Sequence, residues 1–143
     1  MIKIAHRGHF NGPNEFSENN PTDLIAAIAS GFDIEVDIRM NNFGIFLGHD
    51  EMKHEIDEDF IKDIKDHAWF HCKNIAALGY FTNVMPDAKF FWHENDEYTL
   101  TSNGYIWTYP EKVFTNKSIV VVKGKVDLGI YEGAYGVCSD YLL

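Results

Sequence analysis

The chain has 143 residues, of which 45% are hydrophobic, and this suits one domain with a buried core, spanning residues 1–143. It carries 22 acidic and 12 basic residues, for a net charge of −10. Such a charge does not attract nucleic acid or an anionic membrane surface through long-range fields. We therefore expect neither nucleic acid nor a membrane as the partner.

The N-terminus runs directly into a strand pattern, without a basic segment followed by a long apolar stretch. We therefore expect no signal peptide, and a cytoplasmic location as the default. No window of the sequence approaches a membrane span. Cys72 and Cys138 are the only cysteines, and both lie in apolar strand-like runs, which predicts buried free thiols.

The first elements have clear boundaries. An apolar strand over residues 2–6 leads into a polar loop. Asn20 and Pro21 then have the residue types of a helix N-cap and a first helical position, and Gly31 ends the helix. The later elements follow from apolar periodicity: strand 33–39, extended segment 45–48, helix 57–66, strand 68–73, helix 74–81, and strands 89–93, 105–109, 118–123 and 136–141.

Alternating strands and helices are typical of the α/β class. A full (β/α)₈ barrel needs ~250 residues, and the connections after residue 93 are short and poor in helix signal. We therefore predict a compact, reduced TIM-like (β/α) barrel with about seven strands and some outer helices missing.

The strand over residues 33–39 alternates strictly between apolar and polar side chains, so its acidic residues share one face. One interpretation is an antiparallel strand with a solvated polar face. The other is a barrel strand that points Glu35 and Asp37 into the mouth of the barrel, where adjacent carboxylates would need a divalent cation. The strand alone leaves both interpretations open.

Four histidines also lie at or near the C-terminal ends of extended segments, the edge at which α/β barrels build active sites. One such histidine is usually an ordinary surface residue, but four of them with two carboxylates favour a site. Glu94 and Asp96 could supply a further carboxylate, although an exposed acidic loop is the simpler interpretation. The four histidines are His6, His49, His71 and His93.

The first 50 residues resemble the signature of glycerophosphodiester phosphodiesterases and are similar to the related phosphatidylinositol-specific phospholipases C and sphingomyelinase D-like enzymes. The matching segments are His6-Arg7-Gly8, Glu18-Asn19, Glu35-Val36-Asp37 and His49-Asp50. Later segments match more loosely. His71 stands where the family usually has an acidic metal ligand two residues before a lysine, Asn20 replaces a threonine, and the chain is about a hundred residues shorter.

The resemblance implies a role for each matching position. Glu35 and Asp37, with His71 as the third ligand, would bind Mg²⁺ or Ca²⁺. His6 and His49 would be the general acid/base pair. Substrate and phosphate contacts would come from four further residues: Arg7, Lys73, His93 and Trp107.

We therefore predict a metal-dependent phosphodiesterase, a hydrolase acting on a small glycerophosphodiester-like substrate by histidine acid/base catalysis. The alternative is a non-catalytic module that binds phosphate or a phospho-ligand on a degenerate phosphodiesterase fold. A purely structural α/β domain is a further alternative. An amidohydrolase is less favoured because the chain has no His-x-His pattern.

Overall fold

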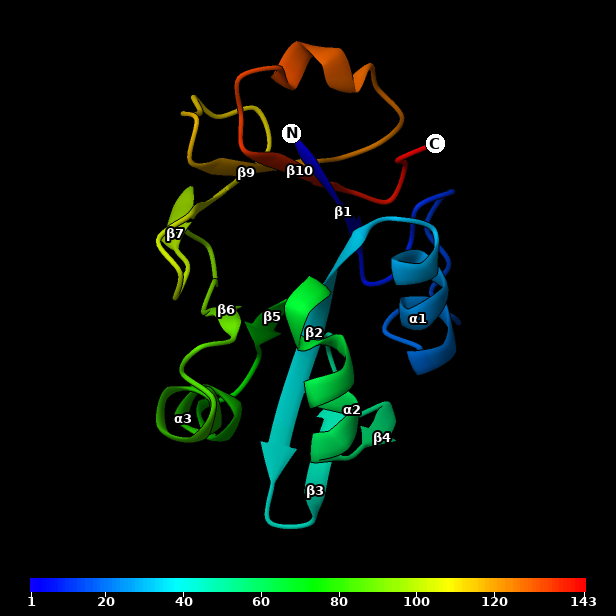
Figure 1. Ribbon diagram of the computed structural model, residues 1–143, viewed down its shortest axis with the longest axis vertical. Coiled ribbons are helices and arrows are strands. Elements are labelled where there is room, and N and C mark those ends of the chain that lie inside the picture. The colour runs from blue at the N-terminus through cyan, green and yellow to red at the C-terminus, as the bar shows by residue number, and fades with distance from the viewer.

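In the computed structural model, which describes residues 1–143, the chain forms a mixed ten-stranded sheet that curls into a half-barrel (Figure 1). Seven strands run parallel in the order β6-β5-β2-β1-β10-β9-β8, and β3, β4 and β7 are antiparallel additions. The strands are β1 (Ile2–His6), β2 (Asp33–Asn41), β3 (Gly44–Leu47), β4 (His54–Ile56), β5 (Ala68–Cys72), β6 (Lys89–Phe91), β7 (Tyr98–Leu100), β8 (Ile106–Thr108), β9 (Ser118–Val122) and β10 (Gly136–Ser139).

Three α-helices lie on the outside of this sheet (Figure 1). Their N-caps follow the usual chemistry, since Asn20, Asp57 and Asn74 each accept a hydrogen bond from a backbone N–H in the first turn. The helices are α1 (Pro21–Ala29), α2 (Glu58–Ile64) and α3 (Ile75–Val84), with 3₁₀ helices at Lys65–His67 and Leu128–Tyr131. None of the helices is both long enough and apolar enough to cross a membrane.

The prediction of a reduced TIM-like barrel with about seven strands is wrong. The sheet is mixed and ten-stranded, and only 23% of the residues are helical, so helices do not alternate with strands. After β6 the connections are turns or short loops, and the crossover from β9 to β10 contains only the 3₁₀ helix at Leu128–Tyr131. Gly124, Gly129 and Gly133 interrupt this crossover, and a run so rich in glycine does not sustain an α-helix.

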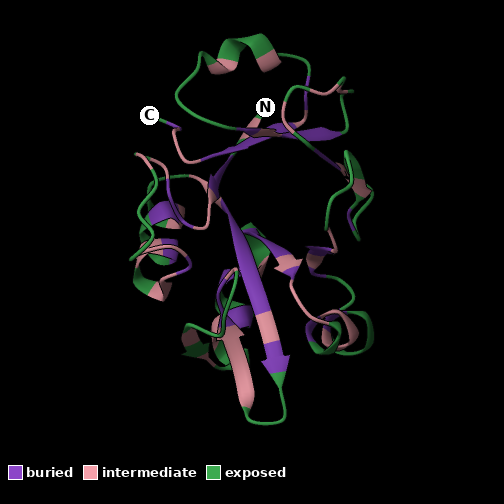
Figure 2. Ribbon diagram, turned by 180° about the vertical axis from the view of Figure 1, so that it is seen from behind, coloured by how far each residue is buried: buried purple, intermediate pink, exposed green.

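The strand β2 is buried along most of its length (Figure 2). Its apolar side chains Ile34, Val36 and Ile38 are fully buried within the larger hydrophobic core, to which α1 and α3 also contribute. Glu35 and Asp37 are 2% and 0% exposed, so the polar face is not solvated. The interpretation of β2 as an antiparallel strand with a solvated polar face is therefore excluded.

A second, smaller apolar cluster takes one buried residue from each of β1, β5, β6, β8, β9 and β10. It contains Ile4, Trp69, Phe91, Trp107, Ile119 and Cys138. Cys72 and Cys138 are both free and buried, as predicted.

The strand register brings the polar residues together. In the parallel pair of β1 and β2, His6 lies opposite Glu35, and in the parallel pair of β2 and β5, Asp37 lies opposite His71. On the other side of β1, Ala5 pairs with Ser139, so the residues after β1 and β10 are also neighbours. One edge of the sheet therefore carries residues from four central strands.

Candidate functional site

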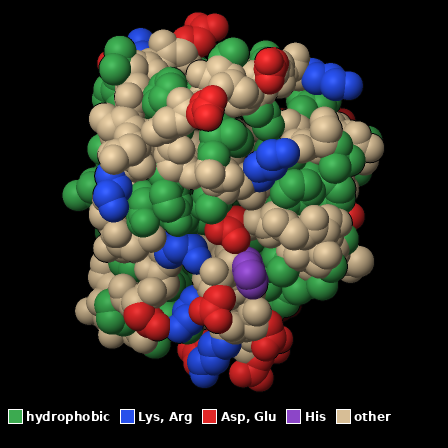
Figure 3. Space-filling view, turned by 45° about the horizontal axis from the view of Figure 1, so that its top comes forward, with side chains coloured by type: hydrophobic (Ala, Val, Ile, Leu, Met, Phe, Trp, Pro, Cys, Tyr) green, Lys and Arg blue, Asp and Glu red, His purple; other side chains and the backbone are tan.

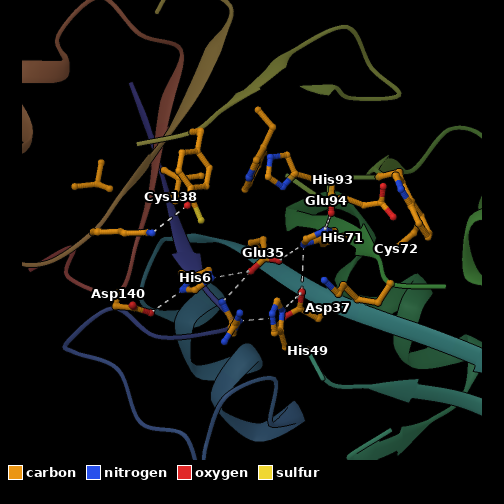
Figure 4. A pocket seen from close by; sticks show the side chains of 18 of the residues that line it. His6, Glu35, Asp37, His49, His71, Cys72, His93, Glu94, Cys138 and Asp140 are labelled. Atoms are coloured by element: carbon orange, nitrogen blue, oxygen red, sulfur yellow. Dashed lines mark hydrogen bonds and ion pairs between the residues drawn. The ribbon is translucent and has the colours of Figure 1, made fainter. Parts of the chain in front are cut away.

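A cavity of about 640 Å³ opens at this edge, and all nine residues predicted from the sequence line it. Its walls come from the C-terminal ends of β1, β5, β6, β8, β9 and β10, together with the middle of β2 (Figure 4). On the face of the molecule in Figure 3, acidic and basic side chains are interspersed, without one extended patch of a single sign.

Glu35, Asp37 and His71 form a compact group at the floor of the cavity (Figure 4). The Nδ1 atom of His71 lies 3.3 Å from Asp37 Oδ1 and 3.6 Å from Glu35 Oε1. One nitrogen or oxygen atom from each residue falls within 4.8 Å of the others. The strand alternation thus directs two carboxylates and an imidazole toward a single point.

The orientation of His71 is fixed by two contacts. Its Nε2 lies 3.1 Å from the backbone oxygen of His93, and its ring stacks on Phe91 at 4.8 Å between centroids. Because a carbonyl oxygen only accepts, Nε2 must carry a proton, and Nδ1 is the atom that faces the carboxylates. If Nδ1 were unprotonated, its lone pair would face two negative carboxylates and be repelled by them. Nδ1 therefore needs either a proton or a cation beside it.

The chemistry of this group fits a divalent ion. A histidine ligand commonly donates its other ring N–H to a backbone carbonyl, as His71 does to His93. Two carboxylates suit Mg²⁺ or Ca²⁺, and an imidazole nitrogen also suits Zn²⁺. Without an ion a proton takes this place: burial opposes it, but the hydrogen bonds and charges of Asp37 and Glu35 raise the pKa of His71 to about 9.

Asp37 is held by a buried amide. Asn19 donates from Nδ2 to Asp37 Oδ2 at 3.0 Å and accepts from the Asp37 backbone N–H at 2.9 Å. Asn19 is fully buried and has a φ of 59°, a left-handed conformation that asparagine tolerates better than most residues. Burial alone would raise the pKa of Asp37, but hydrogen bonds from His49 and His71 and the charges of His71 and Arg7 hold it well below its usual range.

The polar contacts of Arg7 are mainly with carboxylates. Its Nη1 donates to Glu18 at 3.0 Å, and its Nε lies 3.1 Å from Asp37 Oδ2 without the alignment of a hydrogen bond. Its backbone N–H reaches Glu35 Oε2 at 3.3 Å. The predicted phosphate contact would therefore share this guanidinium with Asp37 and Glu18.

His6 is oriented by a carboxylate that the sequence prediction did not include. Its Nδ1 lies 3.0 Å from Asp140 Oδ1, and its Nε2 lies 3.8 Å from Glu35 Oε2. Burial opposes protonation of His6, but the hydrogen bond to Asp140 and the charges of Glu35 and Asp140 raise its pKa. When Nδ1 donates to Asp140, Nε2 is left to exchange a proton in the cavity.

A second imidazole also contacts Asp140 Oδ1. The Nδ1 atom of His9 lies 3.1 Å from Asp140 Oδ1, and His9 is buried. Asp140 directly follows the last strand, and this position at a strand end could have identified it as a site residue from the sequence. His9 lies in a loop, and no pattern in the sequence singles it out.

His49 lies on the loop after β3. Its Nδ1 is 3.4 Å from Asp37 Oδ1, and its Nε2 is 3.6 Å from the exposed carboxylate of Asp50. Arg39 holds the loop by donating to the backbone oxygens of Gly48 and His49. A Cβ atom at Gly48 would collide with the backbone oxygen of Glu51, so this tight loop requires glycine.

The other predicted residues line the cavity in different ways. Lys73 is half-buried, and its ammonium group has no ion pair or hydrogen bond. His93 Nε2 lies 2.6 Å from the backbone oxygen of Asp96, and Trp107 is buried against Phe91 at 4.4 Å between centroids. Glu94 lines the cavity but is exposed and lies outside the Glu35, Asp37 and His71 group.

Searches for similar proteins gave no match to a family model, to a curated protein or to a solved structure.

Proposed function

We propose that the protein is a metal-dependent phosphodiesterase that hydrolyses a small glycerophosphodiester-like substrate. One observation carries the proposal: His6 and His49 enter one cavity beside the Glu35 and Asp37 pair, and a carboxylate lies against each ring. Two oriented histidines around a candidate ion site are what acid/base cleavage of a phosphodiester requires.

Basic side chains are available in the cavity for an anionic substrate. The chain has a net charge of −10, but in this cavity four basic residues balance four carboxylates. Arg7 and Arg39 are held by protein acceptors, whereas Lys73 has none and is free to bind a phosphoryl oxygen. A point charge on a flexible stem suits that task.

The histidines would divide the proton transfers. One would accept the proton of the attacking hydroxyl, and the other would donate a proton to the leaving oxygen. Asp140 keeps the Nδ1 proton of His6 in place, so Nε2 is the atom that exchanges. A divalent ion held by Glu35, Asp37 and His71 would polarise the phosphoryl group and offset its charge. The resemblance further implies attack by an adjacent hydroxyl of the substrate.

The test is a hydrolysis assay with Mg²⁺, Ca²⁺, Mn²⁺ or Zn²⁺, using a glycerophosphodiester and a chromogenic phosphodiester. We expect divalent-dependent turnover that falls at least about 100-fold in His6→Ala and in His49→Ala, the usual loss for an acid/base group. His67→Ala is the matched control, because His67 lies outside the cavity. If the protein cleaves neither compound in the presence of these ions and binds none of them, the proposal fails.

A second candidate is a module that binds a phosphodiester without cleaving it. The observation that favours it is the set of ion pairs around Asp37, against which Arg7, His49 and His71 all lie. This candidate predicts saturable binding of an intact phosphodiester without product. His6→Ala would then alter the dissociation constant alone.

A further inference from the structure

The cavity extends past the candidate catalytic residues to the ends of β8 and β9. There it is lined by Tyr109, which follows β8, and by Lys123, which follows β9. The ammonium nitrogen of Lys123 lies 3.3 Å from the Tyr109 hydroxyl and 5.0 Å from the centre of its ring. A cavity of about 640 Å³ has room for a ligand much larger than one phosphate group.

The charge of Lys123 is held in place but not neutralised. Both contacts of its ammonium group are with the neutral side chain of Tyr109, through the hydroxyl and the ring face. Lys62, Lys65 and Lys112 pair with carboxylates. Lys89 and Lys117 also lie over aromatic rings, but neither of them lines the cavity. Lys123 is exposed, and an ammonium without a counterion that lines a cavity of a strongly acidic chain favours an anionic ligand group.

This cation and the candidate metal ligands come from different parts of the cavity wall. In the sheet, β9 is separated from β2 by β10 and β1. Neighbouring strands lie ~4.8 Å apart, so three steps separate the two backbones by roughly 14 Å along the sheet. A phosphate bound at Glu35 and Asp37 would therefore leave Lys123 available to a different part of the ligand.

We infer that the substrate is a phosphodiester whose alcohol group carries a second anionic group, a phosphate or a carboxylate. Lys123 and the Tyr109 hydroxyl bind that second group, while the diester phosphate lies among His6, His49 and Lys73. The inference rests on the proposed function for the position of the diester phosphate. Tyr109 is a specificity residue in two ways, because it donates to the anion and positions Lys123.

The experiment compares two ligands that differ only in the second anion: glycerophosphoglycerol and glycerophosphoglycerol phosphate. Affinity is measured by calorimetry in the His6→Ala background, so that the ligand is not hydrolysed during the titration. The kcat/KM is measured in proteins that keep His6. The variants are Lys123→Met, Tyr109→Phe and Lys125→Met. Lys125 is the matched control, because it is exposed, lies two residues away and does not line the cavity.

We expect glycerophosphoglycerol phosphate to be preferred about tenfold or more, as for one charge-assisted contact. Lys123→Met should abolish this preference, Tyr109→Phe should reduce it, and Lys125→Met should keep it. Equal binding of the two ligands overturns the inference, as does an equal loss of preference in Lys125→Met. Binding preference without cleavage would refute the catalytic proposal alone, and cleavage without preference would refute only the second anion site.

Discussion

Buried polar side chains determine the shape of this site. Asn19 is the clearest case, because its amide makes two hydrogen bonds to Asp37 and its backbone has a left-handed φ. In the sequence, the Glu18-Asn19 pair is distinctive only as part of a family resemblance. Its physical role is now specific: Glu18 binds Arg7, and Asn19 fixes the rotamer of a carboxylate that is fully buried.

At the residue scale, we predict that Asn19→Ala lowers the free energy of unfolding by about 3 kcal/mol. The reason is that a buried carboxylate loses a donor, and its backbone N–H loses an acceptor. Urea denaturation measures the change. Asn42→Ala is the control, since Asn42 is exposed in a turn and its side chain forms no hydrogen bond, and a change of less than about 0.5 kcal/mol is expected there. Equal effects in the two variants would contradict the prediction.

Strict alternation in one strand allowed part of the site to be predicted from the sequence. Because side chains alternate along β2, Glu35 and Asp37 had to share a face, and burial of Ile34 and Val36 leaves that face directed into the cavity. His9 could not be found in this way. Its contact with Asp140 spans 131 positions and depends on the pairing of β1 with β10 and on the course of an irregular loop.

At the scale of elements, the positions of strands and helices were predictable, but the architecture was not. Each of the seven predicted strands and three predicted helices is present; β1 has the predicted bounds, and the others differ at one or both ends. The short strands β4 and β7 were missed because each has three residues, too few to show a period. The barrel prediction allowed for missing outer helices, but it did not foresee β3, β4 and β7, the antiparallel strands that make the sheet mixed.

The contact between β1 and β10 also predicts how stability depends on pH. Burial alone would raise the pKa of Asp140. The hydrogen bonds from His6 and His9 outweigh this effect and hold the pKa below its usual value. This contribution is present above the unfolded pKa of ~3.9 and is lost as the pH falls below it. The raised pKa of His6 gives the opposite dependence of stability on pH. Its contribution to stability is present below ~6.5 and is lost as the pH rises.

We therefore expect the difference in unfolding free energy between the parent protein and Asp140→Asn to be largest between about pH 4 and pH 6.5, at about 2 kcal/mol. It should decline on both sides of that window. Denaturation of both proteins from pH 3 to pH 9 measures it. A difference that stays constant with pH would show that Asp140 does not interact with charged imidazoles.

At the scale of the whole molecule, the candidate metal ligands join β2 to β5, which is separated from one end of the parallel strand order only by β6. An ion that binds only the folded chain stabilises it by about 2.7 kcal/mol when its concentration is 100 times the dissociation constant. For a domain of this size we expect the melting temperature to rise by about 8 °C on addition of the preferred divalent ion, and chelation to reverse the rise.

Two glutamate variants make this melting experiment specific. Glu35→Gln should abolish the rise in melting temperature, because it removes a buried ligand. Glu94→Gln should preserve it, because Glu94 lies in the same cavity but outside the ligand group. If Glu94→Gln abolished the rise and Glu35→Gln did not, the ion would lie at a different point of the cavity.

The place of β10 in the sheet has a consequence for synthesis of the protein. This strand is last in sequence, yet it lies between β1 and β9, and Ile2 pairs with Gly136. A chain still emerging from the ribosome therefore has β1 and β9 without their shared neighbour, and His6 without Asp140. Such exposed strand edges promote aggregation. The pairing of β10 with β1 joins residues far apart in the sequence, and such pairing is slow. The site can assemble only after residue 140 has left the ribosome.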